Sequence, residues 1–217
     1  MLKVIKLLLV IGLTICVGMG NAWAADRANV AGQFDYYVMS LSWSPEYCAS
    51  NNNPSSTQCG ERRYSLVVHG LWPQYENGGF PADCSVQTTV PQPIVDSMLD
   101  IMPSETLIQH EWDKHGTCSG LSVEKYFQLT RQIYNSIAIP AKYKQPMDYI
   151  MTSVKDLEND LIAVNPTLDS GKIAIDCKSR YLEEIRVCYD KNNQSRTCGR
   201  KVTDKCRAKV VLRPVRG

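Results

Sequence analysis

An alternation of large apolar side chains with other residues runs through positions 34–43. This two-residue period is typical of a strand that packs one face on a core. Residues 63–68 predict a second strand, which delivers His69 at its end. Gly70 and Pro73 follow and interrupt the pattern. Three more strands are expected toward the C-terminus, over residues 172–176, 182–189 and 208–212.

Between these two groups of strands, apolar residues recur every three to four positions, which is the period of a helix. The segments with this pattern are residues 91–102, 104–114, 122–137 and 153–164. Ser153 opens the last of them, with Asp156 three residues later in an approximate capping box. Gly116 ends the second, and Lys114 and His115 occupy its last turn, where the helix dipole favours cations. Helices inserted between runs of strands predict an α+β fold, with several helices on a largely antiparallel sheet.

The first residues are expected to be absent from the mature protein. A positively charged start precedes an apolar run over residues 7–17 and the small-x-small sequence at 22–24. This order predicts a signal peptide over residues 1–24 and a single domain over residues 25–217. An uncleaved anchor fits less well, because the apolar run is shorter than the roughly 20 residues of a membrane span. The protein is therefore expected in the periplasm or outside the cell, without stable membrane association.

The cysteines agree with export. Of nine in the chain, one lies in the predicted signal peptide and an even number remains. Free cysteine pairs oxidise and persist as disulfides in exported proteins, so four disulfides are expected. The eight residues are Cys48, Cys59, Cys84, Cys118, Cys177, Cys188, Cys198 and Cys206.

Charge is divided unevenly along the chain. Residues 25–177 hold 10 Lys and Arg against 18 Asp and Glu, whereas residues 178–217 hold 12 against 4. The basic C-terminal segment either attracts a polyanion or neutralises the rest of the surface, and neutralisation is the favoured interpretation.

All three histidines of the chain fall in two short segments, residues 69–73 and 110–118. Histidine is the side chain whose ordinary pKa allows proton exchange near neutral pH. The same segments contain a glutamate, a lysine and two tryptophans. This composition predicts proton transfer around an anion, and therefore metal-independent phosphoryl transfer with RNA as the leading substrate.

Helical periodicity places the charged residues of the second segment together. At about 100° per residue, with His110 at 0°, Lys114 lies near 40°, Glu111 near 100° and His115 near 140°. Trp112 lies near 200°, outside this wedge. Two imidazoles, one ammonium and one carboxylate are therefore expected on one helix face.

A zinc site is the main chemical alternative, because His110 and Glu111 begin the segment. Zinc protease helices carry histidines four residues apart, whereas His110 and His115 are five apart. We therefore expect no metal and no cofactor. Each residue taken singly is more often structural, as a cap, a core tryptophan or a helical ion pair. Their joint occurrence favours a functional site.

These segments resemble the two active-site segments of the ribonuclease T2 family, which comprises exported ribonucleases with little base specificity. The similar residues are His-Gly-Leu-Trp-Pro at 69–73 and His-Glu-Trp-x-Lys-His-Gly-Thr-Cys at 110–118. Residues 41–43 with Cys48 resemble that family's N-terminal strand, and residues 182–188 resemble its C-terminal core strand. The resemblance therefore reaches both ends of the mature chain.

The resemblance implies a role for each residue of the two segments. His69 and His115 would be the acid–base pair, His110 would bind phosphate, and Glu111 and Lys114 would stabilise the transition state. The chemistry agrees with these roles, because imidazoles can take the proton of the ribose 2′-hydroxyl and protonate the departing 5′-oxygen. His115 is assigned as base and His69 as acid, with the reverse order left open.

This mechanism predicts an endoribonuclease that acts on single-stranded RNA. The first product would be a 2′,3′-cyclic phosphate, which is then hydrolysed to a 3′-phosphate. DNA lacks the attacking hydroxyl and should not be cleaved. We expect a bell-shaped pH profile, since one imidazole must be neutral and the other charged. The protein is expected to act as a monomer.

Base contacts are expected from three neighbouring residues. Trp72 offers a stacking face, as in proteins that bind single-stranded RNA. Gln74 and Tyr75 follow it, and could add hydrogen bonds or a second face. Some relatives carry an acidic residue at position 74 and a glutamine at position 42, whereas this chain has Gln74 and Ser42. A base preference of those relatives is therefore not transferred.

The resemblance also selects four disulfides among the 105 pairings that eight cysteines allow. The second would hold the two active-site segments together. The implied pairs are Cys48–Cys59, Cys84–Cys118, Cys177–Cys206 and Cys188–Cys198.

Two other functions are compatible with the same residues. A secreted binding or toxin-like module would act through a surface, for instance the basic C-terminal one. The complete set of five catalytic residues weighs against it. A phosphodiesterase or phosphatase for small nucleotides is the second alternative, and comparison of RNA homopolymers with a chromogenic phosphodiester would distinguish the two enzymes.

Overall fold

A computed structural model describes residues 29–51, 57–60, 63–86 and 88–215. The predicted signal peptide lies outside these residues. Within the described ranges, no helix has the length and apolar character needed to cross a membrane.

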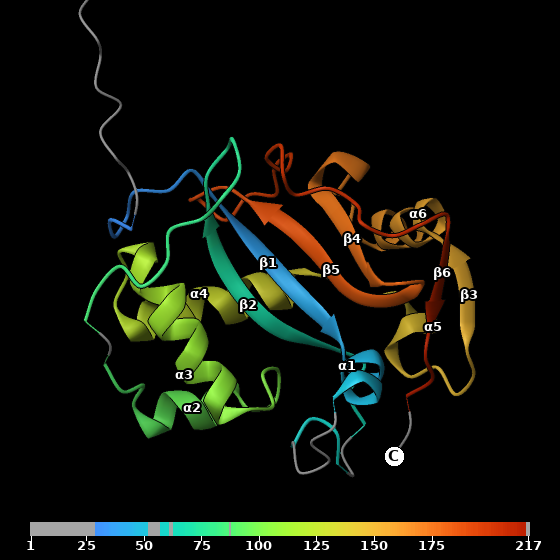
Figure 1. Cartoon of the computed structure of the whole chain (residues 1–217), viewed down its shortest axis with the longest axis horizontal. Coiled ribbons are helices and arrows are strands. Elements are labelled where there is room, and N and C mark those ends of the chain that lie inside the picture. Colours follow the sequence, from blue (N-terminus) through green and yellow to red (C-terminus); the bar gives the residue numbers. More distant parts are fainter. Residues whose placement is uncertain (1–28, 52–56, 61–62, 87, 216–217) are drawn as a thin grey trace, which may run out of the picture.

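Six strands form one sheet, which Figure 1 shows with helices grouped beside both of its ends. The strand order is β2-β1-β5-β6-β3, and β4 pairs with β5 off this path. Every pairing is antiparallel except the short β5–β6 contact. The α+β prediction with a largely antiparallel sheet is therefore confirmed. The strands are β1 (Tyr36–Trp43), β2 (Leu66–Gln74), β3 (Ile150–Ser153), β4 (Ile173–Lys178), β5 (Tyr181–Tyr189) and β6 (Lys209–Leu212).

The helices divide into two groups. In Figure 1, α2, α3 and α4 lie beside β2, whereas α5 and α6 lie near β3 and β6. α3 and α4 both contact β2, so the first group carries one predicted active-site segment next to the other. The α-helices are α1 (Ser44–Ser50), α2 (Gln92–Met98), α3 (Glu105–Lys114), α4 (Val123–Ser136), α5 (Ala141–Lys144) and α6 (Val154–Val164), with 3₁₀ turns η1 (Gly116–Ser119) and η2 (Ser170–Lys172).

Serine caps define where the long helices begin. The side chains of Ser104, Ser122 and Ser153 each accept a backbone N–H from the first turn of α3, α4 or α6. Ser153 bonds the Asp156 amide, as the capping-box pattern predicts. α2 ends at Met98, four residues before the predicted end. The sequence patterns did not predict α1, α5 or β3.

The prediction that the second strand ends at His69 is wrong. β2 continues through Gly70 and Pro73 and pairs with β1 as far as Gln74. Pro73 is tolerated because β2 is the outer strand of the sheet order, where a missing N–H need not interrupt a ladder. The register shifts by one residue at Ser40/Leu41, which is a β-bulge.

The bulge changes which face the side chains of β2 occupy. Val68 and Leu71 both pack in the main hydrophobic core, although strict alternation would place residues three apart on opposite faces. The extra residue of the bulge shifts the alternation between Val68 and Leu71 by one position, so both side chains face the core. The core itself extends from Phe34 to Val215, and Trp43 is its largest fully buried side chain.

Four disulfides join the pairs that the family resemblance implies. Their sequence separations range from 10 to 34 residues. The bonds are Cys48–Cys59, Cys84–Cys118, Cys177–Cys206 and Cys188–Cys198.

Part of the basic C-terminal segment is paired with the acidic remainder of the chain. Arg213 binds Glu46, and Arg196 binds Glu76, at 2.5 and 2.7 Å. Lys205 binds Asp176 at 3.0 Å. These pairs support neutralisation of the two halves on the folded surface.

Candidate active site

A pocket of about 430 Å³ opens where α3 faces the sheet. It contains all five catalytic residues predicted from the sequence, together with Trp72 and Gln74. The lining residues are Val38, His69, Trp72, Gln74, Gly79, Phe80, His110, Glu111, Lys114, His115, Arg186, Lys201 and Val202. Tyr75, the third residue predicted to contact a base, is not among them, and its side chain packs against the main core.

The bulge in β2 brings His69 and Gly70 to the pocket side of the sheet. His69 lines the pocket. A Cβ added to Gly70 would overlap the Glu111 carboxylate and the Trp72 indole nitrogen. Only glycine therefore allows the backbone of β2 to approach α3 this closely. The motif at residues 69–73 thus combines a proton donor or acceptor, a close backbone approach and an aromatic side chain.

α3 presents the predicted wedge to the pocket. His110, Glu111, Lys114 and His115 all line it. Trp112 instead lies in the main core, where its indole N–H donates to Thr88 Oγ1 at 3.0 Å. The helical period and the apolar anchor on the other face together explain this orientation.

His69 is partly exposed and is held by carboxylates on both sides. Its Nδ1 lies 2.5 Å from Glu184 Oε1, and its Nε2 lies 3.8 Å from Glu111 Oε1. Burial opposes the charged ring, but the hydrogen bond and the charge of Glu184 outweigh it, so the pKa of His69 is raised above its usual 6.5. The protonated ring is therefore favoured.

His115 has the opposite environment. The residue is 6% exposed, and within the described chain its Nδ1 is buried without a hydrogen-bond partner. Burial, followed by the positive charges of Lys114, His110 and His69, lowers the pKa of His115 to about 3. The neutral ring, which can accept a proton, is favoured.

Glu111 lies between the sheet and α3. Its Oε2 accepts the Trp72 indole N–H at 2.7 Å. Burial raises the pKa of Glu111 to about 7, despite the lowering effects of His69, Trp72 and Lys114. This carboxyl group therefore exchanges its proton near neutral pH.

Aromatic rings form two walls of the pocket around His115. The Trp72 ring lies 5.6 Å from His115 and 5.1 Å from His69, measured between ring centroids. The Phe80 ring lies 5.4 Å from His115, with the Lys114 ammonium 5.9 Å from its centroid. Phe80 is 45% exposed. A phenylalanine directly after the consecutive glycines Gly78 and Gly79 is the sequence signal that could have identified Phe80 as a pocket residue.

The loop that carries Phe80 is anchored on the C-terminal segment. The Glu76 carbonyl accepts the Arg200 amide at 3.1 Å, and the Glu76 carboxylate binds Arg196. Gly78 has a φ of 99°, and a Cβ there would overlap the Lys201 side chain. The loop therefore fits against Lys201 only with glycine at this position. Lys201 and Arg186 add two cations to the pocket, and both lie outside the two sequence motifs.

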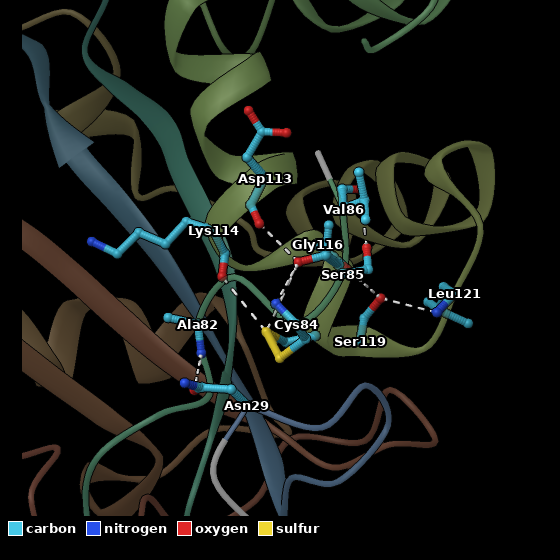
Figure 2. Close-up of a disulfide and its surroundings, with 12 residues drawn as sticks. Asn29, Ala82, Cys84, Ser85, Val86, Asp113, Lys114, Gly116, Ser119 and Leu121 are labelled. Carbon is cyan, nitrogen blue, oxygen red and sulfur yellow. Dashed lines mark hydrogen bonds between the residues drawn. A yellow bond between two sulfur atoms is a disulfide. The ribbon is translucent and has the colours of Figure 1, made fainter. Parts of the chain in front are cut away.

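A disulfide fixes the end of α3. Figure 2 shows Cys84 beside Asp113 and Lys114, in the last turn of the helix. The Cys84 amide donates to Thr117 Oγ1 at 3.2 Å, and the Asp83 amide donates to the Lys114 carbonyl at 3.0 Å. The segment that follows the Phe80 loop is thus tied to the helix that carries His115.

Within the ranges that the structure describes, no group of three or more His, Cys, Asp and Glu side chains is arranged to hold a metal ion.

Comparisons with known proteins show which family the chain resembles. A model of the Ribonuclease T2 family matches residues 34–198. The chain is 39% identical to a ribonuclease of Aeromonas hydrophila over 128 residues, which cover 59% of this chain and 57% of that protein. It is 32% identical to a probable ribonuclease of Haemophilus influenzae over 188 residues, which cover 78% of this chain and 63% of that protein. The chain thus spans about three fifths of the length of these two relatives.

Solved structures show the same fold. An RNase-related protein from Calystegia sepium superposes with a TM-score of 0.68 at 21% sequence identity. The superposition covers 85% of this chain and 98% of that protein.

Proposed function

The chain belongs to the Ribonuclease T2 family, and from this premise we propose that it is an endoribonuclease of single-stranded RNA. The proposed reaction needs no metal and no cofactor. It proceeds by attack of the ribose 2′-hydroxyl, through a 2′,3′-cyclic phosphate, to a 3′-phosphate end. The observation that carries the proposal is one pocket with two histidines whose environments favour opposite protonation states.

In the first step, His115 acts as the base. Its neutral ring takes the proton of the 2′-hydroxyl while the 2′-oxygen forms a bond to phosphorus. The bond from phosphorus to the 5′-oxygen breaks, and protonated His69 gives its proton to that oxygen. The neutral form of His115 and the charged form of His69 are the forms that their surroundings favour. This agreement supports the order of base and acid.

In the second step the roles reverse. His69 takes a proton from water as the water oxygen attacks the cyclic phosphate, and His115 returns a proton to the departing 2′-oxygen. A 3′-phosphate results, and both rings regain their starting protonation states.

The remaining charged residues stabilise the charge that grows on the phosphoryl oxygens. Lys114 and His110 share the α3 face with His115, so the Lys114 charge and the His110 ring lie where the phosphate must bind. Glu111 exchanges a proton near neutral pH, so its protonated form can donate a hydrogen bond to a phosphoryl oxygen. Lys201 extends the positive surface along the pocket, whereas the charge of Arg186 is paired with Glu184 and Asp176.

The base upstream of the cut is proposed to lie between Trp72 and Phe80. Aromatic stacking tolerates every base. Gln74 carries both a donor and an acceptor, and its side-chain amide can therefore pair with different base edges. Little base specificity is the expected result. Phe80 is proposed as the second stacking face in place of Tyr75, because its ring lies 5.4 Å from that of His115, whereas Tyr75 packs against the core.

The proposal extends to the biology that the sequence implies. The protein is expected to be exported to the periplasm or beyond, to act as a monomer, and to leave DNA intact because DNA has no 2′-hydroxyl.

The decisive experiment uses the purified mature chain, RNA and the matching DNA, with an excess of chelator. RNA should be cut to 2′,3′-cyclic phosphate ends that later become 3′-phosphates, and DNA should survive. Loss of cleavage in chelator would contradict the metal-independent reaction. Cleavage of a chromogenic phosphodiester in preference to RNA homopolymers would favour an enzyme for small nucleotides.

A further inference from the structure

We propose that Glu184 is a positioning residue, which fixes the ring of His69 and keeps the proton on it for transfer to the leaving oxygen. The proposal rests on the function of His69 as the acid. It adds a carboxylate from β5 to a site that the two sequence motifs place on β2 and α3.

Glu184 determines which nitrogen of His69 faces the substrate. Its Oε1 lies 2.5 Å from His69 Nδ1, and its side chain is 8% exposed. An ionised carboxylate can only accept, so Nδ1 must carry the hydrogen of this bond. Nε2 is then the nitrogen that points toward the pocket, with Glu111 3.8 Å away. The leaving oxygen therefore meets a defined atom of the ring.

Glu184 is itself held in the ionised state. Arg186 donates to Glu184 Oε2 from Nε at 2.9 Å and from a terminal nitrogen at 2.6 Å. The hydrogen bond from His69 and the charges of His69 and Arg186 outweigh burial and lower the pKa of Glu184 to about 2. The two hydrogen bonds from Arg186 hold the Glu184 carboxylate in one orientation and favour its ionised form.

The chain of alternating charges continues across the sheet. Arg186 binds Asp176 Oδ2 at 3.0 Å, and Lys205 binds the same oxygen at 3.0 Å. Asp176 and Glu184 are paired neighbours on β4 and β5. Each charge thus has an opposite neighbour, and the paired strands β4 and β5, rather than a loop, set the position of Glu184.

Several other groups act on His69, but none replaces Glu184. Glu111 on α3 favours the charged ring from a longer distance, and it is protonated over part of the pH range because burial raises its pKa to about 7. Arg186 opposes the charged ring, as does burial. His115 on the opposite wall is held neutral, because burial lowers its pKa. The permanent counter-charge at His69 is therefore Glu184.

The experiment compares Glu184→Gln with the unchanged protein by NMR titration of the His69 ring, and with pH profiles of kcat and KM on RNA. Glutamine keeps the size and an acceptor but removes the charge. We expect the pKa of His69 to fall by at least about one unit, and the falling limb of the kcat profile to move to lower pH with it. kcat should fall by about 10- to 100-fold with little change in KM, as when an orienting partner is lost.

Matched variants separate this role from a general effect of charge or folding. Glu183→Gln makes the same change at the exposed neighbour on β5 and should leave the His69 pKa within a few tenths of a unit. Glu184→Asp keeps the charge and should restore much of the raised pKa. An unaltered His69 pKa in Glu184→Gln would overturn the proposal.

A measurement on the unchanged protein does not depend on whether a variant folds. Ring ¹⁵N shifts should show the hydrogen on Nδ1 when His69 is neutral, and a hydrogen on Nε2 would refute the proposal. Failure to cleave RNA would instead refute the proposed function and leave the NMR result standing, so the two failures are distinguishable.

Discussion

The pocket has a histidine on its sheet wall and another on its helix wall, and the two have opposite environments. On the sheet, His69 is 37% exposed at its side chain and bonded to an ionised carboxylate. On the helix, His115 is buried, faces other cations and has a buried Nδ1 with no hydrogen-bond partner among the described residues. The pKa of His69 is raised and that of His115 is lowered to about 3.

The difference shows that burial alone does not decide the protonation state of a histidine. Burial opposes the charged form of both rings. The pKa is raised only for His69, which has a counter-charge beside it. Two groups whose pKa values are pushed apart in one pocket are suited to act as acid and base. These environments support the proposed roles of His69 as acid and His115 as base, an order that the sequence motifs leave open.

The largest expected effect comes from removing either ring. His69→Ala and His115→Ala should each lower kcat on RNA by about 10²- to 10⁴-fold, because each deletes one proton transfer. Steady-state kinetics should be measured beside circular dichroism, to show that the variants fold. Since the two rings act as a unit, the double variant should be little slower than either single one. A mild effect would remove that residue from the pair.

The pH profile should show the separation of the two pKa values. kcat/KM should rise at low pH as His115 loses its proton near pH 3, and fall at a pH above the usual histidine pKa of 6.5 as His69 loses its own, by about tenfold per pH unit on each limb. The sequence alone predicts a bell-shaped profile but not its optimum, because it gives no reason for the two pKa values to differ. A rising limb near pH 6 would show that His115 is not held neutral.

Glu111 lies between the two walls, and its raised pKa predicts how folding stability depends on pH. The unfolded chain ionises this group near its ordinary pKa of 4.5, whereas the folded protein does so only near 7, because the side chain is buried. Folding stability is therefore lost as pH rises from 4.5 to 7, by up to roughly 1.4 kcal/mol per unit. Glu111→Gln should be more stable than the unchanged protein at pH 8 and equally stable at pH 4, by urea unfolding.

The same substitution should slow the reaction. Glutamine can still accept the Trp72 indole N–H, but its amide N–H is a weaker donor to a phosphoryl oxygen than a carboxylic O–H, and kcat should fall by about 10-fold. Glu105→Gln, in the exposed first turn of α3, is the matched control for both measurements. Equal stability at pH 8 would contradict the buried, proton-exchanging carboxyl group.

The smallest effect is expected at the aromatic walls. Phe80→Ala should raise KM for RNA with little change in kcat. The expected loss of stacking free energy is about 1–3 kcal/mol. Tyr75→Phe should change KM less, since that side chain packs on the core and does not line the pocket. A larger effect at Tyr75 than at Phe80 would restore the prediction made from the sequence.

The amino-acid sequence by itself determined the features that depend on neighbours along the chain. The periods of two and of three to four residues predicted most strands and helices, and Ser153 marked the start of α6. The five-residue spacing of His110 and His115 placed both in one wedge of α3. These predictions succeed because strand alternation, helix geometry and caps are local properties of the backbone.

Tertiary structure decided the features that depend on residues far apart in the chain. The bulge between β1 and β2 lets Val68 and Leu71 both pack in the core on either side of His69 and Gly70, which the apparent end of the strand at Gly70 concealed. Glu184 reaches His69 across 115 positions of sequence, and Phe80 replaces Tyr75 at the pocket wall. A histidine's pKa is set by burial and by the charges around it, and those exist only after the sheet and α3 have packed together.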